Sequence, residues 1–226
     1  MNAYFDTVDT TTAFWPSVAC LMAVMIYANN GDRNRWHYLV GGICVGLATS
    51  SKYTAFLSFL PILVAHGYHA RRTKSWIDQY IVFGLLAIPV GFLLTTPYAL
   101  LDFITFFNGL LFQSKAYTSH FGAESQTTTS FHLYFNHLFT EGYGEISTML
   151  ALVGLIALSY NKRLEALLLI SFPLALFLFL GLYKVYFPRN ILPAIPFMAL
   201  LSGYGITSIV ASVGKLRSYL SLGSRG

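Results

Sequence analysis

Long apolar stretches, divided by short polar segments, run along most of the chain. A transmembrane helix needs about 20 predominantly apolar residues. The stretch of residues 36–69 is too long for one span, because its 34 residues would form a helix of about 51 Å, against a hydrocarbon core of about 30 Å. The polar run Thr49-Ser50-Ser51-Lys52 interrupts it, so we expect two shorter helices that meet at Lys52.

The whole pattern predicts an all-α, polytopic membrane protein with a single membrane domain over residues 1–226. Seven transmembrane helices are expected, at residues 12–28, 38–50, 53–69, 77–95, 146–160, 164–183 and 191–212. The remaining large segment, residues 97–145, is expected to lie on the outer face of the membrane.

Within this outer segment, apolar and polar positions alternate at helical spacing from Leu100 to Gln113. That pattern is typical of a helix lying at the membrane surface. An eighth span is the alternative, which Asp102 and Asn108 disfavour because polar groups inside a bilayer are costly. Residues 131–139 are expected to form a second short surface helix, and residues 119–130 a flexible connection.

Composition supports the membrane class. Hydrophobic residues make up 55% of the chain and charged residues 10%, against about 25% in a typical soluble protein. The mean hydropathy is +0.59. These values exclude a soluble globular protein and a disordered chain. The net charge of +5 therefore reflects membrane topology, and we expect membrane lipids and no nucleic acid among the partners.

The distribution of Lys and Arg predicts the orientation. With the N-terminus outside, ten of these residues fall in inner segments and four in outer ones, as the positive-inside rule requires. We therefore expect a multi-pass protein of the cell (inner) membrane. The inner set is Arg33, Arg35, Arg71, Arg72, Lys74, Lys162, Arg163, Lys215, Arg217 and Arg225; the outer set is Lys52, Lys115, Lys184 and Arg189.

Two candidate site residues lie at helix ends on the predicted outer face. Asp9, just before the first span, either caps that helix or offers a carboxylate to a metal or a sugar acceptor, with Asp6 as the weaker partner. Lys52 lies between two short helices. It either extends its ammonium to the interface or lines a polar cavity, where broken helices are tolerated.

A third candidate is the outer loop that holds Lys184 and Arg189 on either side of Val185-Tyr186-Phe187-Pro188. Arginine suits phosphate because its planar guanidinium offers parallel donors. The alternative is ordinary interfacial anchoring within an aromatic belt. No metal site is predicted. Asp9 alone supplies too few ligands to fix a site, and a divalent cation stays an open alternative. His137 and Glu141, at positions i and i+4, are the other pair that could hold a metal.

Four segments occur in an order that resembles a known family. They are VDTTTAFW with Asp9, the run from Gly46 to Thr54 with Lys52, the run from Thr96 to Phe103, and Arg189-Asn190-Ile191-Leu192-Pro193. Together they resemble the bacterial and archaeal family 39 glycosyltransferases. That group also includes protein O-mannosyltransferases and the aminoarabinose transferase of lipid A.

The resemblance implies a membrane glycosyltransferase of the C fold (GT-C). Such an enzyme moves a sugar from a polyprenyl-phosphate donor to a lipid, glycan or protein acceptor on the outer face. Carried onto this chain, it makes Asp9 and Asp6 the candidate catalytic carboxylates. Lys52 and Arg189, and less securely Lys184, become the residues that bind the donor phosphate, whose charge grows in the transition state.

The chain also departs from that family. Full members begin with a span and an outer loop that carries an acidic pair, and nothing before Asp6 matches that loop. We therefore expect a C-terminal fragment that is inactive by itself. Two other functions stay open: a transporter or lipid flippase, and a non-catalytic membrane subunit or pseudoenzyme.

Overall fold

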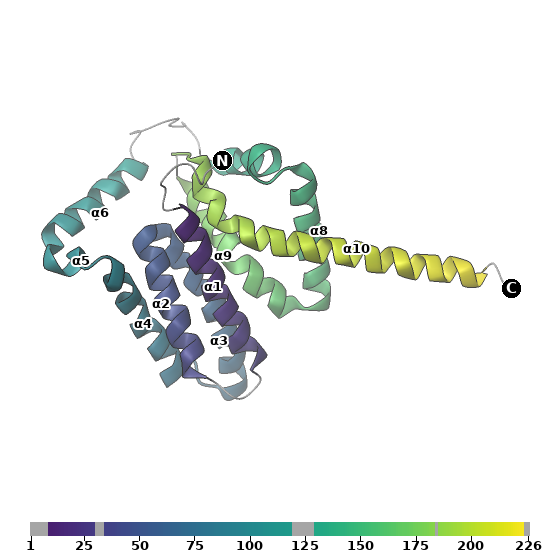
Figure 1. Cartoon of the computed structure of the whole chain (residues 1–226), viewed down its shortest axis with the longest axis horizontal. Helices are drawn as coiled ribbons and strands as arrows, with labels where there is room; N and C mark the ends of the chain where they lie inside the picture. The colour runs from purple at the N-terminus through teal and green to yellow at the C-terminus, as the bar shows by residue number, and fades with distance from the viewer. Residues whose placement is uncertain (1–8, 30–33, 119–128, 184, 224–226) are drawn as a thin grey trace.

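The structure, a computed structural model, describes residues 9–29, 34–118, 129–183 and 185–223 (Figure 1). Almost all of these residues are helical, and none of them belongs to a β-strand. The α-helices are α1 (Asp9–Ala28), α2 (Arg35–Ser51), α3 (Leu60–Thr73), α4 (Gln79–Thr95), α5 (Tyr98–Leu101), α6 (Phe103–Thr118), α7 (Phe131–His137), α8 (Glu145–Asn161), α9 (Arg163–Leu182) and α10 (Ile195–Gly223). Two 3₁₀ segments and one π-helical segment join them. The 3₁₀ segments are η2 (Tyr53–Phe59) and η4 (Pro188–Ala194), and the π-helical segment is η3 (Leu138–Gly142).

Three helical stretches are long and apolar enough to cross a membrane: Asp9–Ala28, Arg163–Leu182 and Pro188–Lys215. A fourth is counted if Phe131–Gly142 and Glu145–Asn161, which meet at a bend of 114°, act as one span. These helices indicate a membrane protein, as the hydropathy predicts. The seven spans, the GT-C fold, the inner membrane and the external N-terminus stay predictions.

The helix break at Lys52 is confirmed. α2 ends at Ser51 because Lys52 adopts extended backbone angles, with φ −157° and ψ 120°. The hydroxyls of Ser50 and Ser51 donate to the Leu47 carbonyl at 2.9 and 3.2 Å, a competition with backbone hydrogen bonding that weakens helix ends. The next seven residues form the 3₁₀ segment η2 rather than the α-helix expected from residue 53. α3 then begins with Pro61 in its first turn, where a missing N–H costs nothing.

The predicted helices of the outer segment are present as α6 and α7. The single helix expected from Leu100 onward is interrupted at Asp102, which separates the short α5 from α6. α5 and α6 extend away from the other helices on the left of Figure 1. Residues 119–128 of the expected flexible connection lie outside the described residues.

Glycines let α2 and α4 approach each other closely. A Cβ atom on Gly46 would collide with the carbonyl oxygen of Ile88, and one on Gly91 with the carbonyl oxygen of Ile43. Small residues have this role in membrane helix pairs, where van der Waals contact replaces the hydrophobic driving force. The α2–α4 pair is therefore fixed by backbone proximity as well as by apolar side chains.

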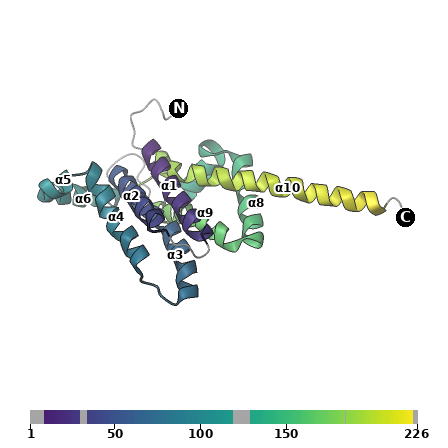
Figure 2. The same ribbon diagram turned by 60° about the horizontal axis from the view of Figure 1, so that its bottom comes forward.

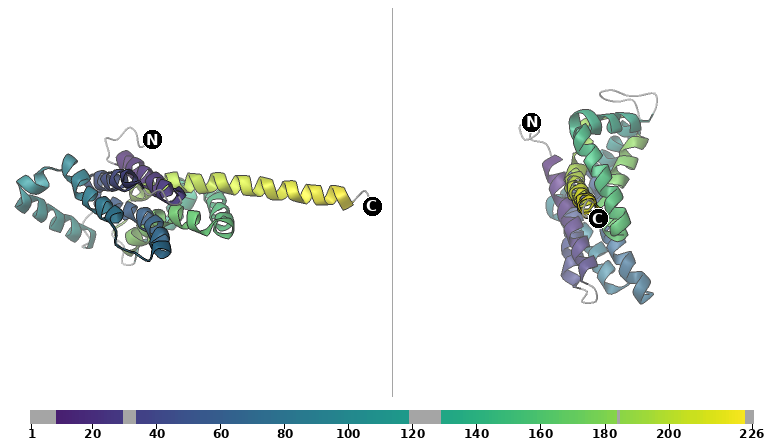
Figure 3. Two further views of the ribbon diagram at one scale, coloured as in Figure 1. Left: turned by 90° about the horizontal axis from the view of Figure 1, so that it is seen from below. Right: turned by 90° about the vertical axis from the view of Figure 1, so that its right-hand side faces the viewer.

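α10 departs from the direction of the helices around it. It runs across the direction of α1 and projects beyond the rest of the chain (Figures 1 and 3), and Figure 2 shows the same projection from another side. Near its start it packs on α8, where a Cβ atom on Gly154 would collide with the Leu201 carbonyl oxygen. Exposed apolar side chains, among them Val210 and Val213, continue along its projecting part.

Replacing Gly91 by Ala is expected to lower the free energy of unfolding by about 1 to 3 kcal/mol, because the new methyl group overpacks the contact with Ile43. The matched control is Gly109→Ala in α6, where a Cβ atom would meet nothing within 4 Å. That change should stabilise its helix by up to about 1 kcal/mol. Thermal unfolding in detergent, followed by circular dichroism, measures both. Equal melting temperatures for the two variants would contradict the close packing of α2 on α4.

Candidate functional site

The centre of the site is an ion pair between two of the residues predicted from the sequence. Lys52 Nζ lies 2.9 Å from Asp9 Oδ1, and the side chains of these residues are 15% and 5% exposed, respectively. Asp9 is in the first turn of α1, where the helix dipole also favours a negative charge. The Thr12 hydroxyl donates to the Asp9 carbonyl at 2.8 Å. The pair therefore neutralises two charges that are both largely withdrawn from solvent.

The helix break makes this pair possible. Lys52 belongs to neither α2 nor η2, and its side chain crosses to a residue 43 positions earlier in the chain. η2 packs against α2, α1 and α9, so the break is held between helices from both halves of the chain. The alternative in which the ammonium only extends to the interface does not account for this contact, because its partner is a buried carboxylate.

Arg189 reaches the same region from a third segment. It is the second residue of η4, which packs against α1 and α9. The loop before η4 is held by Phe187, whose N–H donates to the Tyr134 hydroxyl at 3.3 Å. The Arg189 side chain is exposed, and its guanidinium carbon lies 5.9 Å from the centre of the Phe187 ring. Arg189 is thus an exposed cation at the start of η4.

The pKa of Lys52 responds to its burial and to the charges of Asp9 and Arg189. Burial lowers the pKa of Lys52, which lies outside the candidate spans; the hydrogen bond and charge of Asp9 raise this pKa, and the positive charge of Arg189 lowers it. The positive charge of Arg189 thus opposes the protonated form of Lys52. Two cations and one carboxylate leave one net positive charge, which the exposed Arg189 presents to solvent.

This arrangement suits a phosphate better than a metal ion. A guanidinium and an ammonium form strong, charge-assisted hydrogen bonds to phosphate oxygens. No group of three or more His, Cys, Asp or Glu side chains able to hold a metal ion occurs among the described residues. His137 Nδ1 and Glu141 Oε2 are 3.9 Å apart and form a single surface pair. The geometry gives Asp9 the role of orienting Lys52, since Oδ1 already accepts from that ammonium.

Two predicted site residues, Asp6 and Lys184, lie outside the described residues. The two cysteines, Cys20 and Cys44, are buried, and neither forms a disulfide. An apolar cavity of about 190 Å³, which no sequence pattern indicated, lies under η4. Ile191 and Ala194 of η4 line this cavity, together with residues of η3 and of α7 to α10. Only the tertiary fold brings these elements together.

Comparisons of the chain with protein-family models, with curated proteins and with solved structures each found no match. The fold and the site thus define a helical membrane protein in which a carboxylate–lysine pair lies at the start of α1, and η4, which carries an exposed arginine, packs against α1. The relation to family 39 glycosyltransferases stays a resemblance carried by sequence segments.

Removing one partner of the ion pair should destabilise the protein more than removing both. Lys52→Met leaves the buried Asp9 carboxylate without its ammonium and is expected to cost on the order of 3 kcal/mol. Asp9→Asn leaves Lys52 beside Arg189 without compensation. The double variant should recover about 1 to 3 kcal/mol relative to the sum of the single effects. Unfolding in mixed micelles measures the cycle, and strictly additive effects would show that the two side chains do not interact.

Proposed function

We propose that this chain binds the phosphate of a polyprenyl-phosphate sugar donor and takes part in transferring the sugar to a lipid, glycan or protein acceptor outside the cytoplasm. The observation that carries the proposal is the buried ion pair between Asp9 and Lys52, together with the packing of η4, which carries Arg189, against α1. These are the residues that the family resemblance implicates, and together they retain a positive charge where an anion can reach it.

The chemistry requires a group that accepts a growing negative charge. An acceptor hydroxyl oxygen attacks the anomeric carbon of the sugar, and the bond between that carbon and the phosphate oxygen breaks. The electron pair leaves with the phosphate, and the hydroxyl proton passes to a carboxylate. Lys52 and Arg189 would stabilise the phosphate as its charge increases, which favours the transition state over the bound donor.

Asp9 has a positioning role in this proposal. Its carboxylate holds the Lys52 ammonium at 2.9 Å, so the cation needs little rearrangement when the phosphate arrives. Asp9 and Asp6 are the candidate proton acceptors that the resemblance implies. The contact with Lys52 favours the orienting role for Asp9.

The apolar cavity under η4 adds support from a different kind of observation. Ile191 and Ala194, which line it, belong to the same short segment as Arg189. The apolar lining of this cavity would suit the first units of an isoprenoid chain. A lipid-linked donor needs both features side by side, whereas a soluble nucleotide sugar needs no apolar cavity.

Lys52→Gln and Arg189→Gln are each expected to weaken the binding of polyprenyl phosphate at least tenfold. Each change removes charge-assisted hydrogen bonds, and about 1.4 kcal/mol corresponds to a factor of ten. The binding of radiolabelled polyprenyl phosphate to the detergent-purified chain measures the effect. Lys115→Gln is the matched control, because Lys115 is an exposed cation of α6 on the same predicted face. Equal affinity in wild type and all three variants would refute the phosphate-binding roles.

A second measurement separates the proposed transfer from the other functions. Labelled sugar on a polyprenyl-phosphate donor is incubated with the chain and membrane extract as acceptor. A covalent product that disappears in Arg189→Gln supports transfer. Binding of the donor without a product is the result expected of an inactive fragment or of a non-catalytic subunit. Movement of the donor across a vesicle membrane without a product supports the flippase.

A further inference from the structure

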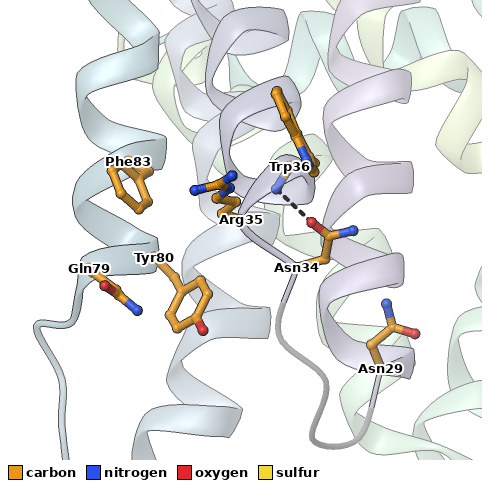
Figure 4. A pocket seen from close by; sticks show the side chains of 7 residues that line it. All are labelled: Asn29, Asn34, Arg35, Trp36, Gln79, Tyr80 and Phe83. Atoms are coloured by element: carbon orange, nitrogen blue, oxygen red, sulfur yellow. Dashed lines mark hydrogen bonds between the residues drawn. The ribbon is translucent and has the colours of Figure 1, made fainter.

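A second cavity, of about 570 Å³, lies at the other end of α1 (Figure 4). Asp9 begins this 20-residue helix and Asn29 directly follows it, so the cavity is about 30 Å from the ion pair. Its walls come from the end of α1, the start of α2 and the start of α4. The cavity is therefore separate from the proposed transfer site, and a ligand could bind in it whether or not the chain transfers a sugar.

Hydrogen-bond donors gather in this cavity. The Arg35 side chain lies between α2 and α4 in Figure 4 and is exposed, and no carboxylate pairs with it among the described residues. Asn34 caps α2 by accepting from the Trp36 N–H at 3.0 Å. Asn29 and Gln79 add two further amide groups to the lining. A guanidinium beside several amides is suited to a phosphate, which accepts many hydrogen bonds and carries negative charge.

Aromatic rings form the rest of the lining. Trp36 is 59% exposed, and the guanidinium carbon of Arg35 lies 5.8 Å from the centre of its ring. Tyr80 and Phe83 of α4 lie on the other side of the cavity. Tryptophan and tyrosine are enriched at the level of lipid headgroups, where one part of the ring system is apolar and another part is polar. This combination is more typical of a lipid headgroup than of a soluble anion.

Two histidines connect the helices around this cavity to the end of α3. His66 links α2 to the turn after α3: its Nδ1 lies 3.1 Å from the Tyr38 hydroxyl, and its Nε2 lies 3.0 Å from the Trp76 carbonyl oxygen. His69 Nε2 lies 2.7 Å from the Ile26 carbonyl oxygen at the end of α1. Since a carbonyl only accepts, both Nε2 atoms donate. The ends of α1 and α3 and the start of α2 thus form one surface.

This surface carries the features of a membrane interface. Arg71, Arg72 and Lys74 are exposed at the end of α3. Trp76 and Ile77, in the turn after α3, are 61% and 81% exposed. The positive-inside rule places these cations at the cytoplasmic side, where the leaflet is rich in anionic lipid, and basic pockets between membrane helices on that side bind lipid headgroups.

We propose that the cavity between the starts of α2 and α4 binds the phosphate headgroup of an anionic phospholipid, with Arg35 as the central ligand. The amides of Asn29, Asn34 and Gln79 complete the polar side of the site. Trp36 and Tyr80 contact the glycerol region. A bound lipid would connect α1, α2 and α4 at the end opposite the ion pair and stabilise their packing.

The test measures lipid retention by the 226-residue chain with native mass spectrometry, in detergent supplemented with phosphatidylglycerol or phosphatidylcholine. Wild type should retain phosphatidylglycerol preferentially. Arg35→Gln should reduce this retention at least fivefold, and Arg35→Lys, which keeps the charge without the planar fork, should reduce it less. Arg163→Gln is the matched control, since Arg163 is an exposed cation at the start of α9 and does not line the cavity. Circular dichroism verifies that each variant is folded.

Three outcomes would overturn the proposal. One is equal retention of the two lipids by wild type. Another is an equal loss in Arg35→Gln and Arg163→Gln, which would show diffuse attraction by surface charge. The third is complete displacement of phosphatidylglycerol by millimolar glycerol phosphate, which would identify a site for soluble phosphate compounds instead of a membrane lipid.

Discussion

The arrangement of the site depends on one interaction, the buried pair between Asp9 and Lys52. Either charge alone would be costly to withdraw from water, so each side chain requires the other. The pair can form only because α2 stops at Ser51 and the backbone of Lys52 is extended. It connects the start of α1 to the junction of α2 and η2, and η4 with Arg189 packs on the same α1. An electrostatic requirement thus fixes how three helical segments meet.

Close backbone packing supplies the rigidity that this requirement needs. α2, whose end carries Lys52, is held against α4 at Gly46 and Gly91, where even a methyl group would collide. Apolar attraction discriminates weakly between helix faces in a bilayer, because lipid tails are as apolar as leucine. Glycine contacts instead allow only a narrow range of registers. The position of Lys52 relative to α1 is therefore determined by sterics as well as by charge.

Local sequence signals predicted part of this structure. The polar run ending at Lys52 predicted the break, because hydroxyl side chains and a charge disfavour a continuous apolar helix. It did not predict that η2 would be a 3₁₀ segment, nor that Asp9 would be the partner of Lys52, since that contact spans 43 positions. The sequence marked Asp9, Lys52 and Arg189 separately, and a family resemblance connected them. The sequence predicted neither cavity, because the walls of each combine elements that only tertiary packing brings together.

The two sites proposed at the ends of α1 both depend on an exposed arginine. A buried cation such as Lys52 is balanced by its carboxylate, so the net positive charge that attracts an anion comes from a second, exposed cation. Arg189 and Arg35 are exposed, and each guanidinium lies beside an aromatic ring, at 5.9 Å from Phe187 and 5.8 Å from Trp36. A ring restrains the guanidinium through a cation–π contact without cancelling its charge. Both arginines thus keep an exposed charge beside a ring, which is the property that the two proposed phosphate sites require.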